Sequence, residues 1–136
     1  MFNNIIQTIN PAIGEVLKEY LIADKQHVSS VIDKSKKASN NGWKNDIHKR
    51  RDVLYRVSLE LKKDKEELAK VATREMGKPL KEAKSEIEKC ATVVEFYAYN
   101  GEIYLHEESI NTDARKSIIK FEPLGVIASI MPWNFP

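Results

Sequence analysis

The C-terminal segment of this sequence carries the residue types best suited to chemistry. A nearly unbroken apolar run at 126–131 is followed by the motif Pro-Trp-Asn-Phe-Pro at 132–136. The run is typical of a strand covered on both faces in a parallel α/β sheet, and such sheets bind ligands beyond the carboxyl ends of their strands. An asparagine held there between bulky neighbours is a neutral hydrogen-bond donor, as an oxyanion hole requires. Asn134 is therefore a candidate catalytic residue.

A plainer interpretation of this segment is structural. Asn134 would then end a strand, and Trp133 would fill space in the core. The residue pattern taken alone favours this structural interpretation over the oxyanion hole.

Cys90 is the obvious nucleophile by residue type, and it is the one cysteine of the chain. It lies at helical spacing from Ile87 and Val94, on the apolar stripe of an expected helix. We therefore expect an inert thiol buried in the core. The three histidines lack the spacing of metal ligands, so the sequence predicts no metal site.

The composition is that of a globular chain, with 136 residues of which 42% are hydrophobic and 31% charged. The formal net charge of +2 argues against a polyanion-binding protein. The only sequence feature that would indicate nucleic-acid binding is the basic run at 48–51. A charged, solvent-exposed helix face explains this run better. No secretory signal and no membrane span is recognisable. We expect a soluble, cytoplasmic protein with neither nucleic acid nor membrane as a partner.

Turn residues and hydrophobic periodicity predict a hairpin followed by four helices. Apolar residues on both sides of the turn at 10–14 indicate an N-terminal β-hairpin. The fourth helix should run over 79–100 and be closed by Gly101. The first three helices should begin after aspartate N-caps, which are Asp24, Asp46 and Asp64.

The last third of the chain has the character of β-structure. Ser117–Glu122 alternates between apolar and polar residues and predicts a strand with one exposed face. The apolar run at 126–131 predicts the first strand of a parallel sheet whose other strands do not follow. The predicted fold class is α/β, with an incomplete sheet.

Four motifs occur in order along the chain: Asn-Pro-Ala-Ile-Gly-Glu at 10–15, Glu-Met-Gly-Lys-Pro at 75–79, Glu-Pro-Leu-Gly-Val at 122–126 and Pro-Trp-Asn-Phe-Pro at 132–136. Together they resemble the amino-terminal part of the NAD(P)-dependent aldehyde dehydrogenase superfamily, in which Thr is usual in place of Ile13. The residues around Met76 and at 112–117 are similar to the succinate-semialdehyde dehydrogenase-like branch.

The resemblance implies an oxidoreductase that acts on aldehydes with NAD or NADP as acceptor. A cysteine thiolate attacks the aldehyde, hydride passes to the cofactor, and water releases the acid. In this family the residue matching Asn134 points its amide at the oxyanion. Four further matches line the nicotinamide-ribose part of the cofactor cleft: Ile130, Met131, Pro132 and Trp133.

The resemblance also divides the chain. Residues 1–112 match the N-terminal hairpin and the helical part of the cofactor-binding domain, 113–122 a strand of the oligomerisation arm, and 123–136 the truncated first strand of the dinucleotide-binding core. The family's nucleophilic cysteine and general-base glutamate have no counterpart, since Cys90 matches a helix position. We therefore expect an N-terminal fragment that is inactive alone, whereas the complete enzyme takes a small aldehyde and forms a homo-oligomer. The alternative is a non-catalytic module that associates with a full-length homologue.

Overall fold

The computed structural model describes residues 4–132 and 134–135, and it begins with an antiparallel hairpin. Strand β1 (Ile5–Ile9) pairs with β2 (Val16–Leu21). In the turn between them the Gly14 N–H donates to the Asn10 carbonyl at 2.8 Å, and Gly14 has a φ of 72°. The asparagine side chain also accepts the Ala12 N–H at 3.0 Å. The predicted N-terminal hairpin is confirmed.

The four predicted helices are present. They are α1 (Lys25–Asn40), α2 (Ile47–Lys63), α3 (Lys65–Met76) and α4 (Leu80–Tyr104), with a short 3-10 turn at Trp43–Asn45.

Two of the three expected aspartate caps make their hydrogen bond. The Asp24 carboxylate accepts the His27 N–H at 2.6 Å, and the Asp46 carboxylate accepts the Lys49 N–H at 2.8 Å. Each bond satisfies a backbone donor that the first helical turn leaves without a partner. Asp64 stands before α3 but makes no such side-chain bond.

The predicted end of α4 at Gly101 is wrong. The helix continues to Tyr104, and the Leu105 N–H donates to the Gly101 carbonyl at 3.1 Å. Glycine inside a helix costs about 1 kcal/mol relative to alanine. The additional backbone bonds and the contact between the rings of Tyr104 and Phe96, whose centroids are 6.3 Å apart, offset this cost.

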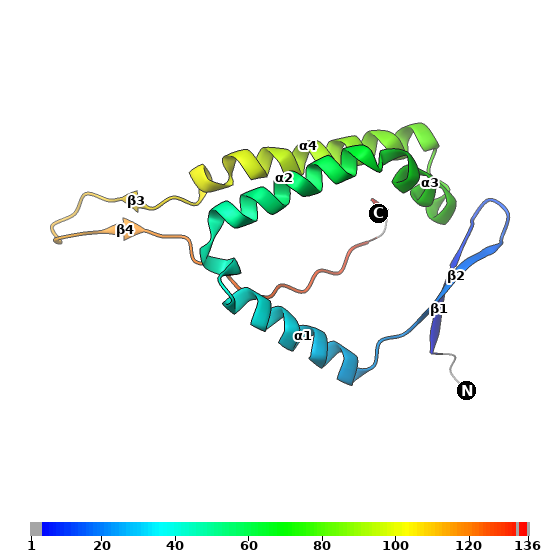
Figure 1. Ribbon diagram of the computed structural model, residues 1–136, viewed down its shortest axis with the longest axis horizontal. Helices are drawn as coiled ribbons and strands as arrows, with labels where there is room; N and C mark the ends of the chain where they lie inside the picture. Colours follow the sequence, from blue (N-terminus) through cyan, green and yellow to red (C-terminus); the bar gives the residue numbers. More distant parts are fainter. Residues whose placement is uncertain (1–3, 133, 136) are drawn as a thin grey trace.

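The long helices α2 and α4 lie side by side and antiparallel, and α3 packs against the first half of α4 (Figure 1). Small side chains dominate the buried positions and allow the helix backbones to approach closely. The buried residues are Ser58, Ala69, Ala72, Ala83, Ile87, Ala91 and Ala98. Two ion pairs across the α3–α4 contact, Lys65–Glu88 at 2.7 Å and Lys84–Glu66 at 2.5 Å, align the helices.

Much apolar surface remains uncovered. The accessible surface area is 11407 Å², whereas a compact monomer of 15.6 kDa exposes about 7300 Å². Leu54 and Val57, two apolar residues of α2 at helical spacing, are 37% and 41% exposed. None of the helices over the described residues has the length and apolar character needed to cross a bilayer.

The last third of the chain contains less regular structure than the sequence predicts. Strand β3 (Glu108–Ser109) pairs antiparallel with β4 (Ile118–Ile119), which lies inside the predicted strand at 117–122. This hairpin projects beyond the ends of α2 and α4, and the segment after it returns between α1 and the helix pair (Figure 1).

The strand predicted over 126–131 is not formed within the described residues. This segment is irregular and exposed, with Ile127 at 68% and Ile130 at 96%. A strand exists through hydrogen bonds to a neighbouring strand, and the described residues supply no neighbour for this one. The apolar pattern therefore indicates a segment that could join a sheet, but the pattern alone does not form a strand.

Candidate functional site

The candidate site residues lie in the segment that ends the chain. Ile130 and Met131 are 96% and 73% exposed, and Pro132 and Asn134 are also exposed. Trp133, the fourth predicted cofactor-lining residue, lies outside the described residues. Ile130 and Met131 thus form an exposed apolar strip in an irregular segment. Asn134 is exposed as well, and it does not lie buried at the end of a core strand.

Phe135 connects this segment to the helices. Phe135 lines a groove of about 750 Å³ along α4 together with Cys90 and Val94, and it is itself 71% exposed. The ammonium nitrogen of Lys78 lies 4.5 Å from the centre of the Phe135 ring, which is within the range of a cation–π interaction. Lys78 also forms an ion pair with Glu86, and these two side chains are only 14% and 11% exposed.

The loop between α3 and α4 is closely packed. Gly77 ends α3 in the left-handed region, with a φ of 74°. A β-carbon added there would lie 3.1 Å from Cγ of Pro11 in the hairpin turn. With Lys78 in contact with Phe135, three motifs far apart in the sequence, at 10–15, 75–79 and 132–135, meet around one helix junction.

The contact between Lys78 and Phe135 was not expected from the sequence. The two residues belong to two of the family motifs, Glu-Met-Gly-Lys-Pro and Pro-Trp-Asn-Phe-Pro. The sequence shows that Lys78 follows a helix-ending glycine and that Phe135 follows Asn134. Neither motif, however, predicts which distant residue it contacts.

The expectation that Cys90 is buried is wrong. Cys90 is exposed and lines the same groove as Phe135. Helical spacing from Ile87 and Val94 correctly places the three on neighbouring positions, but no described element packs over that side of α4. Lysine and glutamate side chains line this groove, and no histidine does, so the thiol lacks the usual base of a cysteine nucleophile.

The described residues form neither a metal site nor a complete dinucleotide pocket. No group of three or more potential metal ligands occurs in 4–132 and 134–135. Ile130 and Met131 offer apolar surface suited to one face of an aromatic ring. Binding a pyrophosphate, however, requires backbone donors such as those of a glycine-rich turn at a helix start, and the described segment at 120–135 contains no helix.

The basic run at 48–51 is accompanied by acid groups, as a charged helix face requires. The His48 Nδ1 lies 3.6 Å from the Glu102 carboxylate on α4. Arg51 pairs with its neighbour Asp52 at 3.0 Å. These contacts favour the helix-face interpretation of this run.

Known proteins similar to this chain identify its family. The sequence model described as the aldehyde dehydrogenase family matches residues 2–136. The chain belongs to the aldehyde dehydrogenase family. A probable NADP+-dependent succinate-semialdehyde dehydrogenase of Synechocystis is 37% identical over 131 residues, which make up 96% of this chain and 29% of that protein.

Solved structures give the same family and fold. The protein designated Gox0499 matches with a TM-score of 0.92 and 29% identity, over 96% of this chain and 29% of its own. The succinic semialdehyde dehydrogenase of Streptococcus pyogenes, solved with NADP+, matches with a TM-score of 0.76 and 26% identity, over 82% of this chain and 25% of its own. The predicted family and the partial α/β aldehyde dehydrogenase fold are confirmed. This chain spans about 29% of the length of such aldehyde dehydrogenases.

Proposed function

We propose that this chain forms the amino-terminal part of an NAD(P)-dependent aldehyde dehydrogenase, and that the whole protein oxidises succinate semialdehyde or a closely related aldehyde. The observation that carries the proposal is the family match over residues 2–136, which includes the intact motif at 132–136. Support for the substrate comes from relatives named succinate-semialdehyde dehydrogenase. Support for the cofactor comes from the NADP+ named for the Synechocystis relative and for the Streptococcus pyogenes structure.

Asn134 is the oxyanion donor in this proposal. Its side-chain N–H donates to the aldehyde oxygen as negative charge develops there during attack by a thiolate. A neutral amide suits this role because it has no proton to lose to the oxyanion. The exposure of Asn134 at the end of an extended segment leaves its amide accessible to a substrate.

The apolar residues before Asn134 form one wall of the cofactor cleft. Ile130, Met131, Pro132 and Trp133 would line the nicotinamide-ribose part of NAD(P), which would supply the hydride acceptor. Ile130 and Met131 offer the apolar surface that would exclude water from that face of the ring.

The nucleophile and the general base lie outside these 136 residues. Cys90 has no histidine in its groove, and its position on α4 corresponds to a helix position of the family. Residues 113–122 belong to the oligomerisation arm, an assignment supported by the projection of the β3–β4 hairpin away from the helices (Figure 1). The complete enzyme is a homo-oligomer.

Two measurements test the proposal. The 136-residue chain, mixed with succinate semialdehyde and either NAD+ or NADP+, should give no reduced cofactor, and Cys90→Ser should leave that result unchanged. In the longer enzyme, Asn134→Ala should lower kcat by about 10²- to 10³-fold, whereas Asn100→Ala, which removes a helix-surface amide bonded to the Phe96 carbonyl, should change kcat little. Cofactor reduction by the 136-residue chain would refute the first statement.

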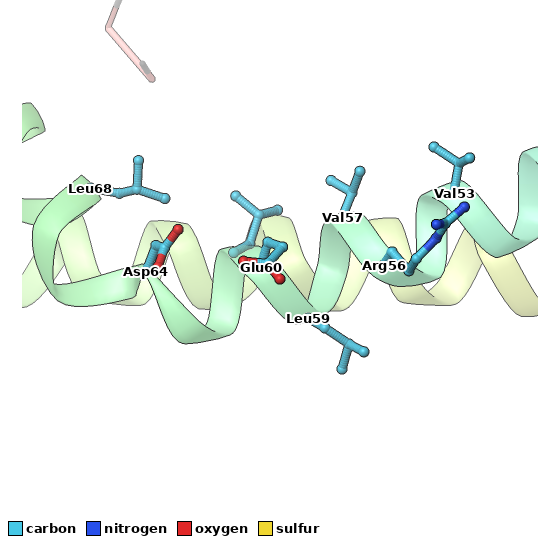
Figure 2. A pocket seen from close by; sticks show the side chains of 8 residues that line it. Val53, Arg56, Val57, Leu59, Glu60, Asp64 and Leu68 are labelled. Atoms are coloured by element: carbon cyan, nitrogen blue, oxygen red, sulfur yellow. The ribbon is translucent and has the colours of Figure 1, made fainter.

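An alternative function is that of a non-catalytic module that associates with a full-length homologue. The observation that favours it is the uncovered surface: the total accessible area exceeds that of a compact monomer by thousands of Å², and many large apolar side chains are exposed. Part of this surface is a groove of about 650 Å³ on α2 and α3, where Val53, Val57 and Leu68 point to the same side (Figure 2).

Size-exclusion chromatography of the 136-residue chain, alone and mixed with an intact homologue, tests this alternative. Co-elution of the two proteins would support an interaction module. Separate elution, with the chain as a stable monomer, would contradict it.

A further inference from the structure

The ammonium group of Lys78 contacts two parts of the chain that are far apart in the sequence. It pairs with the Glu86 carboxylate on α4 and lies 4.5 Å from the centre of the Phe135 ring. We propose that Lys78 is a positioning residue for Asn134, because it holds the Phe135 ring against the α3–α4 junction. The inference rests on the proposed role of Asn134 as the oxyanion donor.

Lys78 is itself held in place from two directions. Its backbone follows Gly77, which ends α3 with a φ of 74° and packs against Pro11. Its side chain is 14% exposed and is paired with a carboxylate that is 11% exposed. Because an ion pair removed from water is strongly destabilised by loss of either partner, the Lys78 ammonium has one favoured position.

Phe135 links the position of Lys78 to that of Asn134, because Phe135 directly follows Asn134 in the chain. An ammonium within about 6 Å of a ring centre attracts the ring face, and adjacent α-carbons are 3.8 Å apart. Attachment of the ring therefore limits how far the adjacent Asn134 backbone can move from the α3–α4 junction. Catalytic groups need such confinement, since a displacement of about 1 Å reduces rates by around 10²-fold.

The segment before Asn134 has few other attachments. Within the described residues, 121–131 make no backbone hydrogen bond to the rest of the chain, and Ile130 is 96% exposed. Farther from Asn134, Phe121, Leu124 and Ile127 line a groove together with residues of α2 and α4. The contact between Lys78 and Phe135 attaches the chain beside Asn134 itself. The groove that Phe135 lines also includes Val93 and Val94, which give it an apolar floor.

The first arm of the test observes the contact directly by NMR on the 136-residue chain. The ring of Phe135 should shift the ε-methylene protons of Lys78 upfield, and Phe135→Leu should abolish the shift while the ion pair with Glu86 remains. Lys70, paired with Glu67 on the surface of α3, is the matched lysine and should show no such shift in either protein. An unshifted Lys78 in the wild-type chain would overturn the proposal.

The second arm measures kinetics in the longer enzyme that carries this chain. Lys78→Met leaves Glu86 without its cation, so the pair is removed together as Lys78→Met/Glu86→Gln. This variant should lower kcat about fivefold, the effect of losing roughly 1 kcal/mol of cation–π attraction, with KM for the aldehyde unchanged. Lys78→Arg keeps a cation over the ring and should retain most of kcat. A wild-type kcat in the double variant would overturn the proposal.

Failure of this inference and failure of the proposed function give different results. If Asn134→Ala reduces kcat strongly but the Lys78 variants do not, Asn134 acts as proposed and Lys78 does not position it. If the upfield shift of Lys78 is present but Asn134→Ala keeps full activity, the contact exists and the oxyanion role of Asn134 is refuted.

Discussion

A β-carbon added to Gly77 would lie 3.1 Å from Cγ of Pro11. This contact seats the turn of the N-terminal hairpin against the junction between α3 and α4. Gly77 is suited to the position twice over, because its φ of 74° belongs to the left-handed region and because a side chain would press on the proline ring.

Gly77→Ala should therefore destabilise the chain through both effects. The left-handed backbone alone costs a non-glycine residue about 1–2 kcal/mol, and the Pro11 contact adds to this. Gly14→Ala is the matched control, because Gly14 has a φ of 72° with no atom within 4 Å of an added β-carbon. Urea unfolding should show a larger loss for Gly77→Ala, and equal losses would show that the Pro11 contact has no energetic effect.

The aspartates before the helices should differ in their contribution to stability. Asp24→Ala and Asp46→Ala each remove a side-chain acceptor from a backbone N–H, at 2.6 and 2.8 Å, and each should cost about 1 kcal/mol. Asp64→Ala removes no such bond and should cost less. Free energies of unfolding measured for the three variants test this order, and a cost for Asp64→Ala as large as the others would contradict it.

The contact between α3 and α4 depends on small residues. Ala69 and Ala83 are fully buried and belong to one cluster, so a larger side chain has no space between these helices. Ala83→Leu should destabilise the chain by about 1–3 kcal/mol. Ala38→Leu on α1, where the alanine is exposed, should be nearly neutral. A thermal shift for Ala83→Leu no larger than that for Ala38→Leu would contradict close packing at this contact.

The ion pairs across the same contact should make stability depend on pH at both extremes. The hydrogen bond from Lys84 lowers the pKa of Glu66, and the hydrogen bond to Glu88 raises the pKa of Lys65. A lowered carboxyl pKa stabilises the folded chain above the unfolded value, near 4.3, and this contribution is lost as the pH falls through the folded pKa. A raised ammonium pKa stabilises it below about 10.4, and this contribution is lost as the pH rises through the folded pKa.

Denaturant titrations across pH can separate the two pairs. Lys84→Met should weaken the loss of stability in acid and leave the alkaline loss intact. Lys65→Met should mainly weaken the alkaline loss and have a smaller effect in acid, because the charge of Lys65 also contributes to the lowered pKa of Glu66. An acid limb unchanged by Lys84→Met would contradict the role of Glu66.

Most helix boundaries could be predicted from the sequence because they depend on nearby residues. Asp24 and Asp46 accept bonds from residues three positions later, and Gly77 ends α3 through its own backbone angle. The prediction failed at Gly101, where the helix continues to Tyr104. There, the contact of Tyr104 with Phe96 outweighs the local preference of glycine.

Burial was predicted less well, as Cys90 illustrates. Helical spacing correctly put Cys90 near Ile87 and Val94, yet the thiol is exposed whereas Ile87 is buried. A periodic pattern shows which residues share a helix face, but coverage of that face depends on which other element packs there. The strand predicted from the apolar run at 126–131 was wrong for a similar reason, because a strand needs a neighbouring strand to pair with.

The sequence by itself determined the family, through ordered motifs, and the local structure, through caps, turns and helical periodicity. Only the tertiary structure decided that Pro11 packs on Gly77 and that Lys78 reaches both Glu86 and Phe135. The physical reason is that caps and turns are satisfied within a few residues. Contacts between distant motifs depend instead on how α3 and α4 pack, which no single motif encodes.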